Sequence, residues 1–115
     1  MRTIIAGSRT FSDAEVMGEV LGKCGWKISR VLCGGARGAD ALGEEWAFKN
    51  NVPVSYFPAQ WDVYGKRAGF VRNEEMANKA DALVAFWDGE SKGTLHMINA
   101  AFRKKLAIFV HTFGE

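Results

Sequence analysis

The stretch Cys33-Gly34-Gly35-Ala36-Arg37-Gly38-Ala39-Asp40 decides the fold. It follows the apolar run Val31-Leu32-Cys33, which is typical of the end of a strand, and it precedes residues 41–50, which are predicted to form a helix. A glycine-rich turn between a strand and a helix presents backbone N–H groups at the helix N-terminus, where the helix dipole also favours negative charge. The stretch therefore predicts a phosphate-binding turn, although such a turn is often only a tight connection.

Individual residues of this turn suit a bound phosphate. Glycines at positions 34, 35 and 38 allow a ligand to approach the backbone closely, and Arg37 places a fork-shaped cation in the middle of the turn. Asp40 is expected to be the N-cap of the following helix, because its side chain is of the type that accepts a hydrogen bond from the first turn.

The composition is that of one domain. The chain has 115 residues, of which 48% are hydrophobic and 24% charged, and its formal net charge is +2. This length suits a single domain over residues 1–115, and the charge is too small to indicate nucleic-acid binding. Cys24 and Cys33 lack the spacing of a metal site or redox pair, and no secretion signal or membrane-spanning run is visible. A cytoplasmic protein with reduced cysteines is expected.

Strand-like and helical segments alternate along the chain. Ser12 and Glu15 form a capping box, so a helix should begin at Ser12. Pro53 places the third strand at a sheet edge, because proline cannot donate to a ladder. Strands are predicted at residues 2–6, 26–33, 52–57, 81–87 and 106–111, and further helices at residues 41–50, 68–80 and 95–105.

This alternation predicts an α/β protein with a three-layer Rossmann-like fold, a mostly parallel sheet of about five strands and helices on both faces. Right-handed crossovers bring all the strand-to-helix turns to one edge of such a sheet. Ligands bind at that edge where the strand order reverses, which here is expected between the first and fourth strands.

Three other segments should then lie beside the glycine-rich turn. They are Gly7-Ser8-Arg9, the loop at residues 61–67 and a second glycine-punctuated turn at residues 88–94, and Arg72-Asn73 follows that loop near the start of the next helix. Trp61 and Tyr64 in the loop are candidates for stacking on a base, with rim packing as the alternative. The cations in or beside these turns are Arg9, Arg37, Lys66, Arg67, Arg72 and Lys92. An anionic ligand with an aromatic base, a nucleotide or its derivative, fits this edge.

The same motifs resemble the SLOG superfamily, the Rossmann-like group that contains DprA/Smf and the LOG-type phosphoribohydrolases, and most of all its YspA-like branch. Gly7-Ser8-Arg9, residues 34–40, Arg72-Asn73 and Ser91-Lys92-Gly93-Thr94 match that branch in order. The resemblance implies a nucleotide-type ligand held between the turns at residues 34–40 and 88–94. In LOG-type hydrolases the second turn ends in a catalytic glutamate, and Met97 stands at that position here. A thioether cannot do the work of a carboxylate, which argues against LOG-type catalysis by the same residues.

The leading hypothesis is a nucleotide-derivative binding protein, for a ligand such as ADP-ribose, NAD or a cyclic nucleotide, with a sensing or sequestering role. The predicted ligand-binding residues are Gly7, Ser8, Arg9, Gly34, Gly35, Ala36, Arg37, Gly38, Asp40, Arg72, Asn73, Asp88, Ser91, Gly93 and Thr94. The first alternative is a hydrolase of the N-glycosidic bond of a nucleotide, in which Asp40, Asp88 or Glu90 replaces the missing glutamate. The second is DprA-like binding of single-stranded DNA, which the low net charge does not favour.

The remaining expectations concern partners. His96 and His111 are isolated and lack a third ligand, so neither a metal site nor a required cofactor is predicted. No membrane partner is expected. Because four tryptophans exceed what a core of this size needs, a homodimer or higher homo-oligomer is a reasonable expectation.

Overall fold

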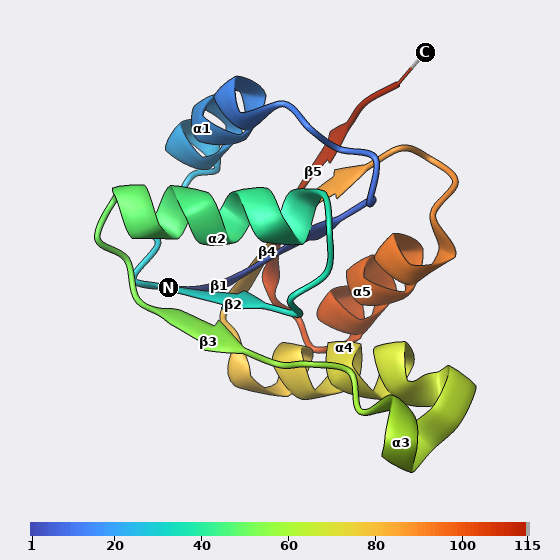
Figure 1. Ribbon diagram of the computed structural model, residues 1–115. Coiled ribbons are helices and arrows are strands. Elements are labelled where there is room, and N and C mark those ends of the chain that lie inside the picture. Colours follow the sequence, from blue (N-terminus) through green and yellow to red (C-terminus); the bar gives the residue numbers. More distant parts are fainter. Residues whose placement is uncertain (115) are drawn as a thin grey trace.

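A computed structural model of the chain describes residues 1–114 and has a five-stranded, fully parallel sheet at its centre (Figure 1). The strands run in the order β3-β2-β1-β4-β5. They are β1 (Arg2–Gly7), β2 (Arg30–Cys33), β3 (Val54–Tyr56), β4 (Ala82–Trp87) and β5 (Ala107–Thr112). The predicted α/β class is confirmed, and the strand order reverses between β1 and β4 as expected.

Helices cover both faces of the sheet. In Figure 1, α1 (Ala14–Lys23) and α2 (Ala39–Lys49) lie above it, and α4 (Ala68–Lys79) and α5 (Lys92–Arg103) lie below it. The short helix α3 (Trp61–Tyr64) and the 3-10 turn η1 (Gly65–Arg67) lead into α4. None of the helices in residues 1–114 combines the length and apolar character needed to cross a membrane.

The sheet separates two hydrophobic core layers. Ile5 of β1 and Met17 of α1 belong to the first layer, under α1 and α2, whereas Ile4 and Met97 belong to the second, under α4 and α5. Neighbouring strand residues point to opposite faces, so strands buried on both sides must be apolar throughout. This is why β4 is apolar from end to end and why Ile4, Ile5 and Ala6 follow one another in β1.

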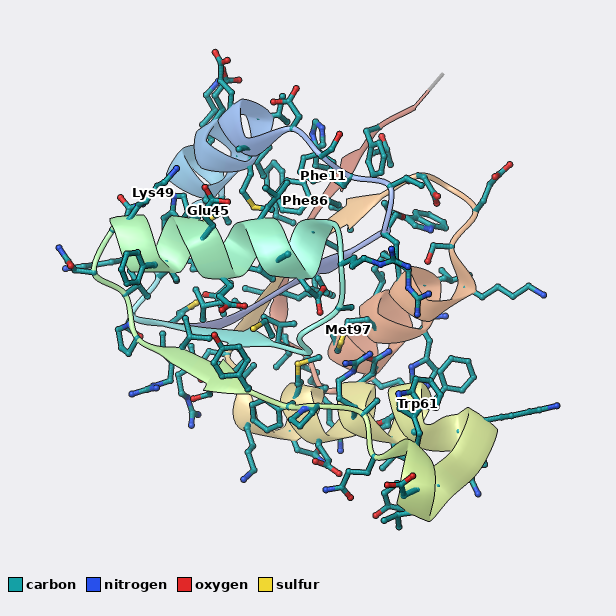
Figure 2. All side chains as sticks on the ribbon, viewed as in Figure 1. Phe11, Glu45, Lys49, Trp61, Phe86 and Met97 are labelled. Atoms are coloured by element: carbon teal, nitrogen blue, oxygen red, sulfur yellow. The ribbon has the colours of Figure 1, made fainter. Side chains whose placement is uncertain are left out.

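The start of α1 differs from the capping-box prediction. The helix begins at Ala14, and Asp13 is its N-cap, with its side chain accepting a 3.1 Å hydrogen bond from the Val16 N–H. Ser12 therefore does not cap the helix. Phe11 belongs to the first core layer, where its ring stacks on Phe86 at 4.6 Å between centroids (Figure 2).

The second strand and the segment at residues 61–67 also differ from the sequence prediction. The second strand begins at Arg30 rather than Trp26, because the chain turns at Gly25 (φ +100°) and the Trp26 indole instead donates to the Thr3 hydroxyl at 3.0 Å. The segment 61–67, expected to be a loop, forms α3 and η1.

The third strand lies at the sheet edge, as Pro53 predicts. The Pro53 carbonyl still accepts a 2.9 Å hydrogen bond from the Val31 N–H. The proline therefore costs the sheet one N–H donor but keeps its acceptor. The regular part, Val54–Tyr56, is shorter than the predicted 52–57.

Candidate functional site

A cavity of about 460 Å³ opens at the carboxyl ends of β1 and β4, where the strand order reverses. Its walls come from the end of β1, the turn before α2, the segment α3 to α4, and the start of α5. Of the residues predicted from sequence to bind ligand or stack on a base, it is lined by Gly7, Ser8, Arg9, Ala36, Asp40, Trp61, Arg72, Asn73, Asp88, Ser91, Gly93 and Thr94. Topology thus brings together motifs that are far apart in sequence.

Ser8 joins the ends of the two central strands. Gly7 pairs with Phe86 in the β1–β4 register, and the Ser8 N–H donates to the Phe86 carbonyl at 2.9 Å. The Ser8 hydroxyl in turn accepts from the Asp88 N–H at 3.2 Å. An added Cβ at Gly7 would come 2.3 Å from the Phe86 carbonyl oxygen, so the close strand pairing requires glycine there.

Asp40 organises the glycine-rich turn. Its Oδ2 accepts from the Gly34 N–H at 3.1 Å and from the Ala36 N–H at 3.5 Å, and the residue is only 6% exposed. The N-cap of α2 is Gly38, at φ +78°, so the expectation that Asp40 caps the helix is wrong. Two backbone donors predicted to face a phosphate are therefore taken by a carboxylate of the chain itself.

Arg72 and Asn73 on α4 connect this turn to α5. The Arg72 Nη1 donates to the Gly34 carbonyl at 3.1 Å, and its Nε donates to the Asn73 Oδ1 at 3.0 Å. The Asn73 Nδ2 lies 3.3 Å from the Gly93 carbonyl, to which it donates. A Cβ at Gly34 would lie 1.9 Å from Arg72 Nη1, so the guanidinium fits only because residue 34 has no side chain.

The second turn is capped by its own polar side chains. The Asp88 Oδ1 accepts from the N–H groups of Glu90 and Ser91, at 2.9 and 2.8 Å. Ser91 is the N-cap of α5, and its hydroxyl accepts from the Thr94 N–H and the Thr94 hydroxyl, at 3.3 and 3.0 Å. The helix starts at the cavity wall, where the positive end of its dipole favours an anion.

Apolar side chains form part of the cavity wall. Met76 and Met97, each 1% exposed, line it together with Ala6, and Figure 2 shows Met97 on the inner side of α5. Trp61, which is 57% exposed, and Phe70, which is 46% exposed, are aromatic residues at its rim. Figure 2 shows Trp61 extending from α3 towards α5. The cavity thus combines a charged wall with buried apolar surface.

Comparison with known proteins agrees with this architecture. The model of the "YspA, cpYpsA-related SLOG family" matches residues 1–64. The Gene 61 protein of Mycobacterium phage D29 is 36% identical over 126 residues, a match that covers 99% of this chain and 97% of the phage protein. The chain belongs to the YspA-related SLOG family. The resemblance inferred from the motifs is thereby confirmed.

A solved structure shares the fold of this SLOG protein. DNA processing protein A (DprA) from Streptococcus pneumoniae superposes with a TM-score of 0.77 at 16% sequence identity. The match covers 95% of this chain and 49% of the DprA chain, so the SLOG chain described here spans about half the length of that protein. At this level of identity the comparison shows a common fold.

Some predicted residues lie outside the cavity wall. The predicted residues that do not line it are Gly34, Gly35, Arg37, Gly38, Tyr64 and Glu90. Two of them support the wall from behind. Gly34 contacts Arg72, and a Cβ at Gly38 would lie 2.4 Å from the Ser8 carbonyl oxygen, so both glycines pack against residues that do line the cavity.

The cavity also has wall residues that the sequence analysis did not assign to the site. They are Ala6, Thr10, Gly69, Phe70, Met76 and Met97, whereas Lys66, which also lines the wall, was named among the cations at this edge. Met76 lies one helical turn beyond Arg72, and this i,i+4 spacing was a usable signal. Phe70 had no such signal, because its position depends on how α3 and η1 lead into α4.

The candidate catalytic carboxylates have different environments. Burial raises the pKa of Asp40, while the Arg72 guanidinium and the N–H groups of Gly34 and Ala36 act in the opposite direction. Hydrogen bonds from the backbone of Glu90 and Ser91 lower the pKa of Asp88, which stays ionised at neutral pH. Glu90 is exposed and outside the cavity wall. Within residues 1–114 no cluster of three or more metal-ligating side chains occurs.

Proposed function

We propose that this SLOG protein binds a nucleotide or nucleotide derivative in the cavity between β1 and β4. The observation that carries the proposal is the composition of that wall. The wall carries three cations, Arg9, Lys66 and Arg72, and it also contains the buried thioethers of Met76 and Met97. A phosphorylated ligand with a flat base matches this combination of cations and apolar surface.

The phosphate is assigned to the start of α5 and to Arg9 and Lys66. The Ser91 hydroxyl takes the Thr94 N–H, so the first turn of α5 offers a phosphate the N–H groups of Lys92 and Gly93. An added Cβ at Gly93 would meet no atom within 4 Å, which leaves room for a ligand. The turn at residues 34–38 is a poorer candidate, because Asp40 already accepts the N–H groups of Gly34 and Ala36.

The base and ribose are assigned to the other parts of the cavity. Trp61 stands at the rim, where an indole can stack on a purine, and the buried methionines supply apolar surface. Asp88 is an ionised acceptor on the wall, of the kind that accepts hydrogen bonds from ribose hydroxyl groups.

Isothermal titration calorimetry tests the proposal. The purified protein is titrated with adenine and guanine nucleotides, ADP-ribose, NAD and cyclic dinucleotides. We expect at least one probe to bind with a Kd below about 1 mM, and Lys66→Ala to weaken it about tenfold, the effect of losing one charge-assisted contact. Lys104→Ala is the matched control, because Lys104 follows the far end of α5. If no probe binds, or if both lysine variants weaken binding equally, the proposal is wrong.

Two assays on the same purified protein distinguish nucleotide binding from the two alternative functions. A hydrolase of the N-glycosidic bond would release free base on incubation with a nucleotide, which chromatography detects, whereas a binding protein returns the nucleotide intact. A single-stranded DNA binder would bind an oligonucleotide with an affinity that falls steeply with salt and is insensitive to added nucleotide. Met97 buried in the cavity wall, in place of a carboxylate, supports binding over cleavage.

A further inference from the structure

His96 is on the second turn of α5 and contacts the Asn73 side chain on α4. Its ring stacks on Phe70, with centroids 4.1 Å apart and planes at 14°. Its Nδ1 is 3.2 Å from the Asn73 Nδ2, and its Nε2 is 3.9 Å from the Glu74 Oε1. Because Phe70 and Asn73 both line the cavity, the histidine contacts two wall residues while not lining the wall itself.

The hydrogen bonds of Asn73 specify one protonation state of this histidine. The amide group has two N–H donors, and they are directed at the Gly93 carbonyl and at the His96 Nδ1. Its oxygen accepts from the Arg72 Nε. A nitrogen that accepts a hydrogen bond carries no proton, so His96 must be neutral with its proton on Nε2, facing Glu74.

Protonation of His96 breaks this arrangement whichever way the amide is turned. If Asn73 keeps its orientation, the imidazolium Nδ1–H faces an N–H donor. If the amide turns over, its oxygen can accept from His96, but its nitrogen then faces the Arg72 Nε, which is also a donor. In the first case Asn73 loses its bond to His96. In the second case it loses its bonds to Arg72 and to the Gly93 carbonyl, which then faces the amide oxygen. Arg72 and Asn73 are the residues that join the turn at Gly34 to the start of α5.

We propose that His96 is a positioning residue for the nucleotide site, and that its protonation releases the Arg72–Asn73 connection and weakens ligand binding at acid pH. The proposal rests on the proposed function, since it concerns regulation of the same cavity. His96 acts through Asn73 and Arg72, and does not itself touch the ligand.

The surroundings of His96 agree with this role. The charged groups that face the ring are Glu74 from α4 and Arg103 from α5, which pair with each other. Burial lowers the pKa of His96 below its ordinary value of 6.5, Glu74 raises it and Arg103 lowers it. The net direction is down, so the ring is neutral at physiological pH and charges only on acidification.

Nuclear magnetic resonance tests the hydrogen-bond chain without any ligand. In the free protein above about pH 7, the ring nitrogens of His96 should show the Nε2–H form, and the Asn73 side-chain amide signals should shift with the same midpoint as His96 on acidification. If the Asn73 signals stay fixed while His96 titrates, or if the neutral ring carries its proton on Nδ1, the inference is wrong whatever the protein binds.

Binding of ADP-ribose as a function of pH tests the consequence. Neither its diphosphate nor its adenine titrates between about pH 7.5 and pH 5, where histidine does. The wild-type affinity should fall as pH is lowered, approaching a slope of about tenfold per pH unit below the pKa of His96, as expected when binding excludes one proton. The His96→Asn variant, whose side-chain oxygen can replace Nδ1 as acceptor, should bind as tightly as wild type at the upper pH and change less than about twofold.

Two further variants complete the design. His96→Leu removes the acceptor and should bind weakly at every pH. Glu74→Gln removes the charge that favours the imidazolium, so the midpoint of the wild-type pH dependence should move to lower pH. Equal pH dependence in wild type and His96→Asn would refute the inference, because Asp40 and all other titrating groups are the same in both. If ADP-ribose does not bind, the proposed function fails on that ligand while the resonance experiment still decides the inference.

Discussion

The carboxylate of Asp40 accepts two backbone N–H groups that the glycine-rich turn would otherwise present to a phosphate. The turn therefore keeps its shape without a ligand, because Asp40 supplies an internal acceptor for these N–H groups. A sequence motif of glycines between strand and helix does not reveal this. The same sequence pattern is compatible with a turn that binds an external phosphate and with a turn whose N–H groups are taken by its own carboxylate.

Removal of the Asp40 carboxylate should destabilise the protein. Asp40→Ala leaves the buried N–H groups of Gly34 and Ala36 without their acceptor, and we expect the free energy of unfolding in urea to fall by about 1–3 kcal/mol. Asp40→Asn retains an acceptor oxygen and should lose less than about 1 kcal/mol. Equal losses in the two variants would show that the hydrogen bonds are not what Asp40 contributes.

The difference in unfolding free energy between wild type and Asp40→Asn should depend on pH in a definite direction. Because burial raises the pKa of Asp40 in the folded state above its ordinary 3.8, the folded protein binds this proton more tightly than the unfolded chain. The contribution of Asp40 to stability is therefore greatest below that ordinary value and declines as pH rises through the folded pKa. The stability difference between wild type and Asp40→Asn should shrink over the same interval.

At the scale of elements, the sequence predicts the order and type of the principal strands and helices, because their apolar runs and periodicities are strong. It predicts their ends less well. Residues 26–29 read as part of a strand, but Trp26 is used as a lateral hydrogen-bond donor to β1. The segment 61–67 reads as a loop because the four residues of α3 are too few to show a helical period.

The start of α1 gives a direct test of a misassigned cap. Asp13, not Ser12, accepts from the Val16 N–H, so Asp13→Ala should lower the free energy of unfolding by about 1 kcal/mol. Ser12→Ala is the matched control and should change it by less than about 0.5 kcal/mol, as surface substitutions usually do. Urea unfolding of both variants measures the difference. A larger loss for Ser12→Ala would restore the capping box as the signal that starts the helix.

At the scale of the whole molecule, topology decides where the site is. The alternation of strands and helices predicts a parallel sheet, and handedness then places the turns along one edge. This is why Arg9, Asp88 and Thr94 could be assigned to one place from sequence alone, and the structure brings all three to the cavity wall. The rest of the wall, such as Phe70, depends on the path from α3 to α4, which only tertiary packing specifies.

The sheet also divides the molecule into two layers that should respond independently to mutation. Met17 and Met97 are both 1% exposed, but Met17 of α1 packs in the first core layer, whereas Met97 of α5 lines the cavity in the second. Truncation of either to alanine removes a buried side chain and should lower the free energy of unfolding by about 2–4 kcal/mol. Stability alone therefore cannot tell the two methionines apart.

Ligand affinity should distinguish them. Met97→Ala removes apolar surface from the cavity wall, and we expect ADP-ribose to bind about fivefold more weakly, which corresponds to the loss of about 1 kcal/mol of apolar contact. Met17→Ala should leave the affinity unchanged, because its layer is separated from the cavity by the sheet and distant substitutions act additively. Calorimetric titration at a temperature where both variants are folded provides the measurement. Equal weakening by both would mean that the site depends on the global stability of the fold rather than on the residues that form its wall.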